Sequence, residues 1–150
     1  MFKVKIIAVG KVKEDYIRQG IEEYSKRLKA FCSVEMTEIK EEVGDDMHNL
    51  KAEAENILPK MGLNAYALAI EGEKLSSEKF AATVKKAIDS GSELTFIIGS
   101  SNGLDDKVKQ AAKGKISFSD MTFPHTLARL ILFEQLYRAF TIINGKAYHK

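Results

Sequence analysis

The sequence predicts an α/β domain built around a mostly parallel sheet of five to six strands. Two observations lead to this prediction. Segments typical of strands and of helices alternate five times along the 150 residues, with short connections between them. The strand-like segments are compact apolar runs, such as Val4 to Val9, which are typical of strands buried on both faces. Because no repeat, linker or low-complexity segment interrupts the alternation, we expect residues 1–150 to form a single domain.

Each element is bounded by a change of periodicity or by a stop signal. Apolar residues three and four apart mark the helices, whereas continuous or alternating apolar residues mark the strands. Gly10, Pro59, Gly62 and Gly91 end the elements that precede them, and Ser76 offers an N-capping hydroxyl. In chain order we expect a strand at 4–9, a helix at 16–29, a strand at 32–39, a helix at 47–58, a strand at 64–70 ended by Glu71 and Gly72, a helix at 76–90, a strand at 94–98, a helix at 104–113, a strand at 115–118 and a helix from 124 to about 140.

The composition excludes several classes of protein. It is 45% hydrophobic and 29% charged, which is ordinary for a folded globular protein. Cys32 is the only cysteine, so an intrachain disulfide and a cysteine-cluster metal site are excluded. The three histidines show no metal-ligand spacing. No apolar run approaches about eighteen residues and the N-terminus lacks a secretory signal, so we expect a cytoplasmic protein with no membrane contact and no metal.

The charges are unevenly distributed along the chain. Residues 1–30 carry eight Lys/Arg against four Asp/Glu, residues 31–60 carry three against eight, and residues 121–150 carry four against one. If the two basic ends meet in the fold, they form a modest surface suited to a polyanion. A solvated surface of mixed charge explains the same distribution.

Three loops follow strands of the predicted sheet and are the first places to look for a ligand. They begin at Glu71, Gly99 and Ser117, and ligands of open α/β sheets bind where such loops gather. The 99–103 loop has neither the dinucleotide-binding nor the P-loop spacing of glycines. Its small residues still allow a ligand to approach the main chain closely. A plain turn between strand and helix is the alternative.

The last helix is apolar on almost all sides. Such a helix needs a second partner besides its own sheet, and the same helix of another subunit would supply one. A central core helix in a monomer is the alternative. Two polar pairs interrupt it, His125 with Arg129 and Glu134 with Arg138, each four residues apart. The second pair resembles a surface ion pair of small energy, and the tail 145–150 taken alone resembles a frayed end.

Four stretches together identify a family. They are VKIIAVGKVKEDY at the start, LAIEGEKLSSEKFA and FIIGSSNGL in the middle, and FSDMTFPHTLARLILFEQLYRAFTIINGKAYHK at the end. They closely resemble the ribosomal RNA large subunit methyltransferase H family, over nearly the whole chain. The most specific part is the combination of TFPH, a YRAF helix and a terminal YHK.

The resemblance implies a fold and an activity. The fold is the SPOUT-type α/β knot, a single domain with a C-terminal trefoil knot, and the protein is a homodimer built on the knotted face. Such an enzyme transfers a methyl group from S-adenosyl-L-methionine to N3 of a pseudouridine in 23S rRNA, in the helix 69 region. Its partner is that RNA within the large subunit or the whole ribosome.

The resemblance also implies a cofactor site, in which the three loops hold S-adenosyl-L-methionine inside the knot. The family often has Gly-Gly-Ser where this chain has Gly99-Ser100-Ser101, so we expect Ser100 to narrow the space beside the cofactor slightly. The cofactor-binding residues carried over by motif are Leu68, Gly99, Phe118, Ser119, Asp120, Met121, Thr122 and Phe123.

Methylation of N3 requires loss of an imide proton and stabilisation of the charge that develops on the base. The predicted catalytic residues are Arg138, Tyr148 and His149. His149 would accept the proton directly or through water, and Arg138 would pair with a phosphate or a base carbonyl oxygen. Arg129 and Lys150 are predicted to bind substrate. The tail is expected to act either in its own chain or on the cofactor pocket of a partner subunit.

Two other functions stay open on the residues alone. A non-catalytic nucleotide-binding α/β module would explain the alternation and the glycine loops, but not the apolar helix or the tail. A purely structural dimer would explain the helix only. Within the enzyme interpretation, the modest net charge of +2 indicates recognition of an assembled ribosome and not of naked RNA.

Overall fold

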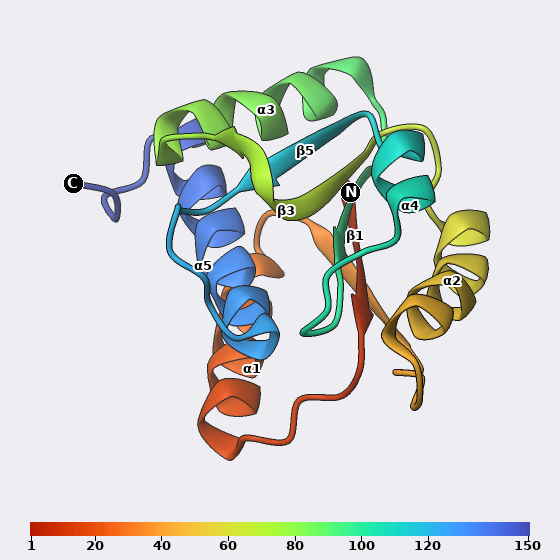
Figure 1. Cartoon of the computed structure of the whole chain (residues 1–150). Coiled ribbons are helices and arrows are strands. Elements are labelled where there is room, and N and C mark those ends of the chain that lie inside the picture. Colours follow the sequence, from red (N-terminus) through yellow and green to blue (C-terminus); the bar gives the residue numbers. More distant parts are fainter.

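A computed structural model describes residues 1–150 as a five-stranded sheet with helices on both faces (Figure 1). The strand order is β2-β1-β4-β3-β5, and every neighbouring pair is parallel. The prediction of an α/β domain on a parallel sheet is confirmed. The elements are β1 (Lys3–Val9), α1 (Asp15–Leu28), β2 (Ser33–Ile39), α2 (Asp46–Ile57), the 3₁₀ turn η1 (Leu58–Lys60), β3 (Ala65–Lys74), α3 (Ser77–Ser90), β4 (Leu94–Ile98), α4 (Asp106–Ala111), β5 (Gly114–Ser117) and α5 (His125–Ile143).

The burial of each strand follows from its place in the sheet. All five residues of the central β4 are buried, as its unbroken apolar sequence LTFII requires. The outer strand β2 alternates apolar and polar residues, and most of its side chains reach solvent. The unbroken apolar sequence of β4 and the alternation in β2 thus agree with their places in the middle and at the edge of the sheet.

Two apolar cores lie on opposite faces of the sheet. The larger packs under α1, α3 and α5, and the smaller packs under α2 and α4 (Figure 1). Helix starts are set by side-chain caps: the carboxylate of Asp45 accepts from the backbone N–H of His48 at 3.1 Å, and the hydroxyl of Ser76 accepts from that of Lys79 at 3.1 Å. The predicted capping role of Ser76 is confirmed.

Strand β3 is longer than expected. It was predicted to end at Glu71 and Gly72, but it runs on to Lys74 beside β5, with a shift of register between Leu68 and Glu73. A Cβ atom on Gly72 would lie only 2.7 Å from the backbone of Ile116 in β5. Gly72 is therefore a close-approach residue inside the strand pair, and not a terminator.

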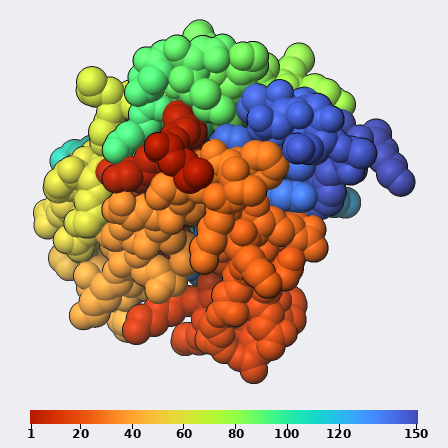
Figure 2. All heavy atoms as spheres, turned by 180° about the vertical axis from the view of Figure 1, so that it is seen from behind, coloured from red at the N-terminus to blue at the C-terminus, as the bar shows by residue number.

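Helix α5 has two partners within its own chain. It lies on the sheet between α1 and α3, and none of its side chains is fully exposed. In Figure 2 the C-terminal part of the chain fills the space between α3 and the region of α1. The need for a second apolar partner is thus met inside one subunit, so the helix alone gives no argument for a dimer. The homodimer stays a prediction, as does the trefoil knot.

The two basic ends of the chain meet in the fold. The ring of Phe2 lies 6.4 Å from that of Phe140 near the end of α5, and the phenol oxygens of Tyr24 and Tyr148 are 3.4 Å apart. None of the helices combines the length and the apolar sequence that a membrane span requires. No group of three or more His, Cys, Asp or Glu side chains is placed to hold a metal ion.

Candidate functional site

A cavity of about 370 Å³ opens at the carboxyl ends of β3, β4 and β5. All three loops singled out from the sequence contribute to its wall, as the topology of a parallel sheet leads one to expect. Its volume lies within the range of about 300–1,000 Å³ that is usual for small-molecule sites. Of the eight residues carried over as cofactor-binding, seven line it: Leu68, Gly99, Phe118, Ser119, Met121, Thr122 and Phe123.

The eighth residue, Asp120, points elsewhere. Its carboxylate accepts a hydrogen bond from the ammonium of Lys74 at 2.7 Å, and its side chain is 84% exposed. The loop around it is ordered by Ser119, whose hydroxyl accepts from the backbone N–H of Met121 at 3.0 Å. Asp120 therefore ties this loop to the end of β3 and does not line the cavity.

The β4 loop forms a wall of bare main chain. A Cβ atom on Gly99 would overlap the carbonyl oxygen of Gly103, so only glycine fits at position 99. Ser100 lies on the cavity wall, and its hydroxyl accepts from the backbone N–H of Asn102 at 3.3 Å. The side chain of Asn102 in turn donates to Asp46 at the start of α2, at 3.1 Å. No local pattern predicts this link, because the two residues are 56 positions apart.

One ion pair belongs to the cavity wall. The ammonium of Lys109 on α4 lies 2.8 Å from the carboxylate of Glu71 on β3, and both residues line the cavity. The hydrogen bond from Lys109 lowers the pKa of Glu71, so this carboxylate stays ionised at neutral pH. The sequence placed Glu71 at the start of a candidate ligand loop but gave no indication of its partner Lys109. The cavity therefore combines main-chain groups, apolar side chains and one paired carboxylate.

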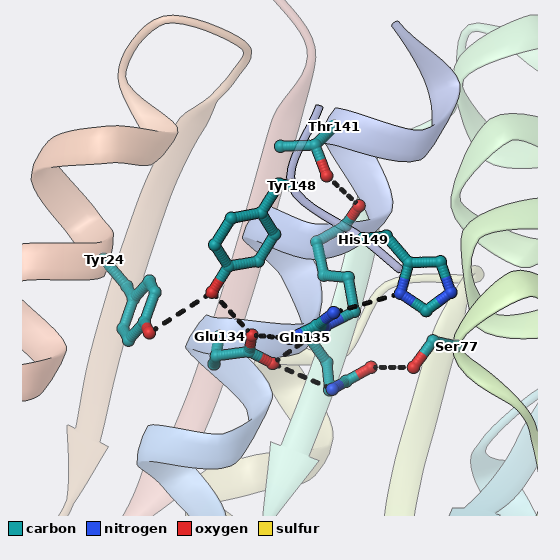
Figure 3. A network of polar contacts seen from close by, with 8 residues as sticks. Tyr24, Ser77, Glu134, Gln135, Thr141, Tyr148 and His149 are labelled. Atoms are coloured by element: carbon teal, nitrogen blue, oxygen red, sulfur yellow. Dashed lines mark hydrogen bonds and ion pairs between the residues drawn. The ribbon is translucent and has the colours of Figure 1, made fainter. Parts of the chain in front are cut away.

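The three predicted catalytic residues come together in a second cluster, at the far end of α5 (Figure 3). Glu134 is its centre. The carboxylate of Glu134 accepts from Arg138 at 2.6 Å and from the phenol of Tyr148 at 2.8 Å. The guanidinium of Arg138 also lies over the ring of Tyr148, 4.8 Å from its centre. The pair of Glu134 and Arg138 is thus half-buried and shared with the tail, which the i,i+4 spacing alone did not reveal.

His149 completes the cluster. Its Nδ1 lies 3.0 Å from Nη1 of Arg138, and its Nε2 lies 2.7 Å from the carboxylate of Glu78 in the first turn of α3. A second link joins the same helices, because the hydroxyl of Ser77 donates to the side-chain oxygen of Gln135 at 2.8 Å (Figure 3). The tail is therefore docked, and the alternative of a frayed end is wrong.

The environment of the cluster shifts the pKa values of Tyr148 and Arg138. Burial raises the pKa of the Tyr148 phenol, and its hydrogen bonds with Tyr24 and Glu134 raise it further. The hydrogen bond to Glu134 raises the pKa of Arg138. Tyr148 is therefore a neutral hydrogen-bond donor at physiological pH, and Arg138 is a permanent cation.

The cavity and the cluster lie at opposite ends of α5. Ala128 lines the cavity and Arg138 belongs to the cluster. Ten residues of α-helix separate their backbones by about 15 Å. Neither Arg138 nor the tail residues line the cavity of their own chain. The predicted cofactor-binding and catalytic residues thus form two separate sites within one subunit.

The two predicted substrate-binding residues differ in their accessibility. Lys150 is exposed at the chain end, beside the cluster. Arg129 is fully buried: its guanidinium lies 2.7 Å from the carboxylate of Glu38 and donates to the carbonyl oxygen of Gly10 at 3.0 Å. A contact between Arg129 and an RNA would require this ion pair to open. The buried position of Arg129 therefore favours a structural role.

Comparison with known proteins identifies the family. A family model described as a predicted SPOUT methyltransferase matches residues 2–149. The chain is 46% identical over 153 aligned positions to the ribosomal RNA large subunit methyltransferase H of Caldicellulosiruptor saccharolyticus, covering 98% of this chain and 99% of the relative. The chain belongs to this family of SPOUT methyltransferases.

Other relatives extend the match. The family member from Bacillus pumilus is 48% identical over 157 positions, with 98% of this chain and 99% of that protein covered. Among solved structures, a probable methyltransferase from Bordetella pertussis superimposes with a TM-score of 0.59 over 92% of this chain and 94% of that one. Because its sequence is only 12% identical, that structure supports the fold alone. The predicted family and enzyme class are confirmed.

Proposed function

We propose that this protein uses S-adenosyl-L-methionine to methylate N3 of a pseudouridine in the helix 69 region of 23S rRNA, on the assembled ribosome in the cytoplasm. The observation that carries the proposal is the cavity at the carboxyl ends of β3, β4 and β5, which gathers seven of the eight residues expected to bind the cofactor. The names of the relatives, which describe them as methyltransferases of large-subunit ribosomal RNA, support the substrate class.

The residues of the cavity fit this cofactor. Gly99 allows the tight turn that forms part of the cavity wall, since any side chain there would collide with Gly103. The apolar side chains of Leu68 and Phe118 offer a surface on which an adenine ring can pack. When bound, S-adenosyl-L-methionine supplies a methyl group on a positively charged sulfur. Because Lys109 compensates the carboxylate of Glu71, the ion pair adds polar groups to the wall without adding net charge.

The tail cluster supplies the groups that act on the RNA. Arg138, which Glu134 orients, is a permanent cation for a phosphate or for the oxygen on which negative charge develops. The phenol of Tyr148, which donates to Glu134 in this structure, is a neutral donor that could turn to the same oxygen. His149 is the candidate proton acceptor for the imide N–H of the base.

The distance of about 15 Å between cavity and cluster favours action across a homodimer. We propose that the tail of one subunit completes the cofactor pocket of its partner. Mixed dimers test this. At limiting cofactor, a chain ending at Ala147 and a full-length Gly99→Ala chain are each expected to show little activity alone, whereas co-expressed mixed dimers regain activity. Mixed dimers as inactive as both parents would show that each tail serves its own chain.

Removal of Tyr148 to Lys150 tests the assignment of the tail. The truncated protein should bind S-adenosyl-L-methionine in calorimetry as the full-length chain does, yet transfer no labelled methyl group to ribosomes that lack the modification. Mapping of the label identifies the nucleoside. Full activity of the truncated chain contradicts the role of the tail. Failure of the full-length chain to bind the cofactor favours a nucleotide-binding module of another specificity or a structural dimer.

A further inference from the structure

Both ring nitrogens of His149 are engaged, by groups of opposite charge. Nδ1 faces the guanidinium of Arg138 at 3.0 Å, and Nε2 faces the carboxylate of Glu78 at 2.7 Å. A guanidinium has only N–H donors, whereas an ionised carboxylate only accepts. Nδ1 must therefore carry the lone pair and Nε2 the proton. The two neighbours together define one neutral tautomer of His149.

Glu78 is placed by the start of α3. Ser76 caps the helix, and Ser77 in its first turn is bonded to Gln135 of α5, so the backbone that carries Glu78 is fixed against the helix that carries Arg138. The side chain of Glu78 is 64% exposed, whereas that of His149 is 23% exposed. An exposed pair of this kind contributes little to stability. The contact with Glu78 instead orients the imidazole of His149, the less exposed partner.

The charge state of Glu78 agrees with this contact. Its hydrogen bond with His149 is the largest cause that lowers the pKa of Glu78. The carboxylate is thus ionised at neutral pH and remains an acceptor for Nε2–H. In contrast, Glu134 is already occupied by Arg138 and Tyr148, so it is not available to the imidazole.

We propose that Glu78 is a positioning residue for His149: it holds the Nε2–H tautomer so that Nδ1 is the proton acceptor, and Arg138 covers Nδ1 until substrate draws the guanidinium away. This inference rests on the proposed function, and it adds a residue that lies outside the predicted site. A phosphate or base oxygen that attracts Arg138 exposes the Nδ1 lone pair at the same moment. In the free enzyme, Arg138 therefore covers the proton acceptor Nδ1 of His149.

The proton step balances without any further group. The N3–H bond of the base breaks and its proton forms a bond with Nδ1 of His149, while the electron pair stays on N3 and makes it nucleophilic. The imidazole becomes an imidazolium, whose Nε2–H still points at the carboxylate of Glu78. A carboxylate in this position both orients an imidazole and stabilises its cationic form. The loss of Glu78 should therefore reduce turnover more than substrate binding.

The ring of His149 can be observed directly, because the chain has only three histidines. In NMR spectra of ¹⁵N-labelled full-length protein, the ring signals of His149 are assigned by their absence in His149→Gln. We expect them to show the Nε2–H tautomer. Its Nε2–H proton should be shifted downfield by the charged acceptor. In Glu78→Ala this proton should exchange with water and disappear, whereas in Glu78→Gln it should persist with a smaller shift, since an amide oxygen still accepts.

Turnover is measured on the same variants. Glu78→Gln should lower kcat on unmodified ribosomes by about tenfold and leave KM for ribosomes unchanged. The loss is only part of the roughly 10²–10⁴-fold that a general base contributes, because His149 itself is still present. Cofactor affinity should also stay unchanged, since Glu78 does not line the cavity. Glu55→Gln is the matched control, because Glu55 is an exposed helical glutamate without a bonded partner, and it should behave as the unmodified chain.

Each outcome decides the inference. An Nδ1–H tautomer in the unmodified protein overturns it, and so do ring signals of Glu78→Ala that match the unmodified protein. Unchanged kcat in Glu78→Gln and Glu78→Ala, with His149→Gln inactive, overturns the positioning role even if the contact exists. If Glu78→Ala does not fold, Glu78→Gln carries the comparison. An unmodified enzyme that binds cofactor but methylates no ribosome refutes the proposed function, and with it the catalytic part, whereas the ring signals still report the contact.

Discussion

The guanidinium of Arg129 on α5 and the carboxylate of Glu38 at the end of β2 form an ion pair at 2.7 Å, although 91 residues separate them. Arg129 is fully buried and also donates to the carbonyl oxygens of Val9 and Gly10, at 3.4 and 3.0 Å. The pair thus joins the carboxyl ends of the two outermost strands on that side, β1 and β2, to the helix whose start lines the cavity.

Replacement of Arg129 by methionine should destabilise the protein by about 3 kcal/mol or more, because it leaves Glu38 and two carbonyl groups without their donor. Urea denaturation followed by circular dichroism measures the free energy of unfolding. Arg18→Met is the control: its pair with Asp15 is exposed, so the loss should stay below about 1 kcal/mol. Equal losses in the two variants would show that burial of the Arg129 pair is energetically irrelevant.

The sequence indicated that Arg129 was unusual but not where it lies. An arginine in an apolar helix is either a functional group on a surface or a buried cation with a partner, and the choice depends on Glu38, which no local pattern connects to it. The same limit applies to the links between Asn102 and Asp46 and between Glu78 and His149. The alternation of strand-like and helix-like segments, in contrast, predicted the parallel sheet, because the local periodicity of apolar residues shows which faces are buried.

The loops of the cavity were predictable for a related reason. Parallel strands bring their carboxyl ends to one edge of the sheet, so three loops far apart in sequence had to meet there. What the sequence could not supply was the course of β3 past Gly72, since a glycine more often ends a strand than lies within one. Its real cause, the close approach of Ile116, is visible only once β5 is in place.

Gly99→Ala should reduce affinity for S-adenosyl-L-methionine by at least about tenfold, because the added Cβ atom meets the carbonyl group of Gly103 and forces the loop into the cavity or away from it. Calorimetric titration measures the affinity. Gly62→Ala is the control: its φ of +69° is strained for alanine by about 1–2 kcal/mol, but nothing lies near its Cβ and it does not line the cavity. Cofactor affinity equal in both variants and in the unmodified chain would contradict a role for the tight turn.

Cys32 should resist alkylation in the native protein. It is 2% exposed, and burial raises the pKa of its thiol from 9.0 to about 12, so almost no thiolate forms at pH 8. Because the unfolded thiol ionises at lower pH than the folded one, the contribution of Cys32 to stability is complete below pH 9.0 and is lost as pH rises from there to about 12. Mass spectrometry after iodoacetamide treatment should show an unmodified native chain and a modified chain in guanidinium. Rapid native labelling would mean that the thiol is accessible.

Glu134→Gln should loosen the C-terminal tail. The carboxylate of Glu134 holds both Arg138 and the phenol of Tyr148, and its charge strengthens these two hydrogen bonds in a half-buried site. A weakening of about 1.5 kcal/mol would raise the population of the undocked tail about tenfold. Lys146 is exposed just before the docked residues, so trypsin should cut after it several-fold faster in the variant, as intact-mass measurements over time would show. Glu55→Gln is the control for the loss of one surface charge. Cleavage at the same rate in both variants would mean that Glu134 does not hold the tail, and that the edge-to-face contact of Tyr148 with Tyr137, 4.8 Å between ring centres, is sufficient.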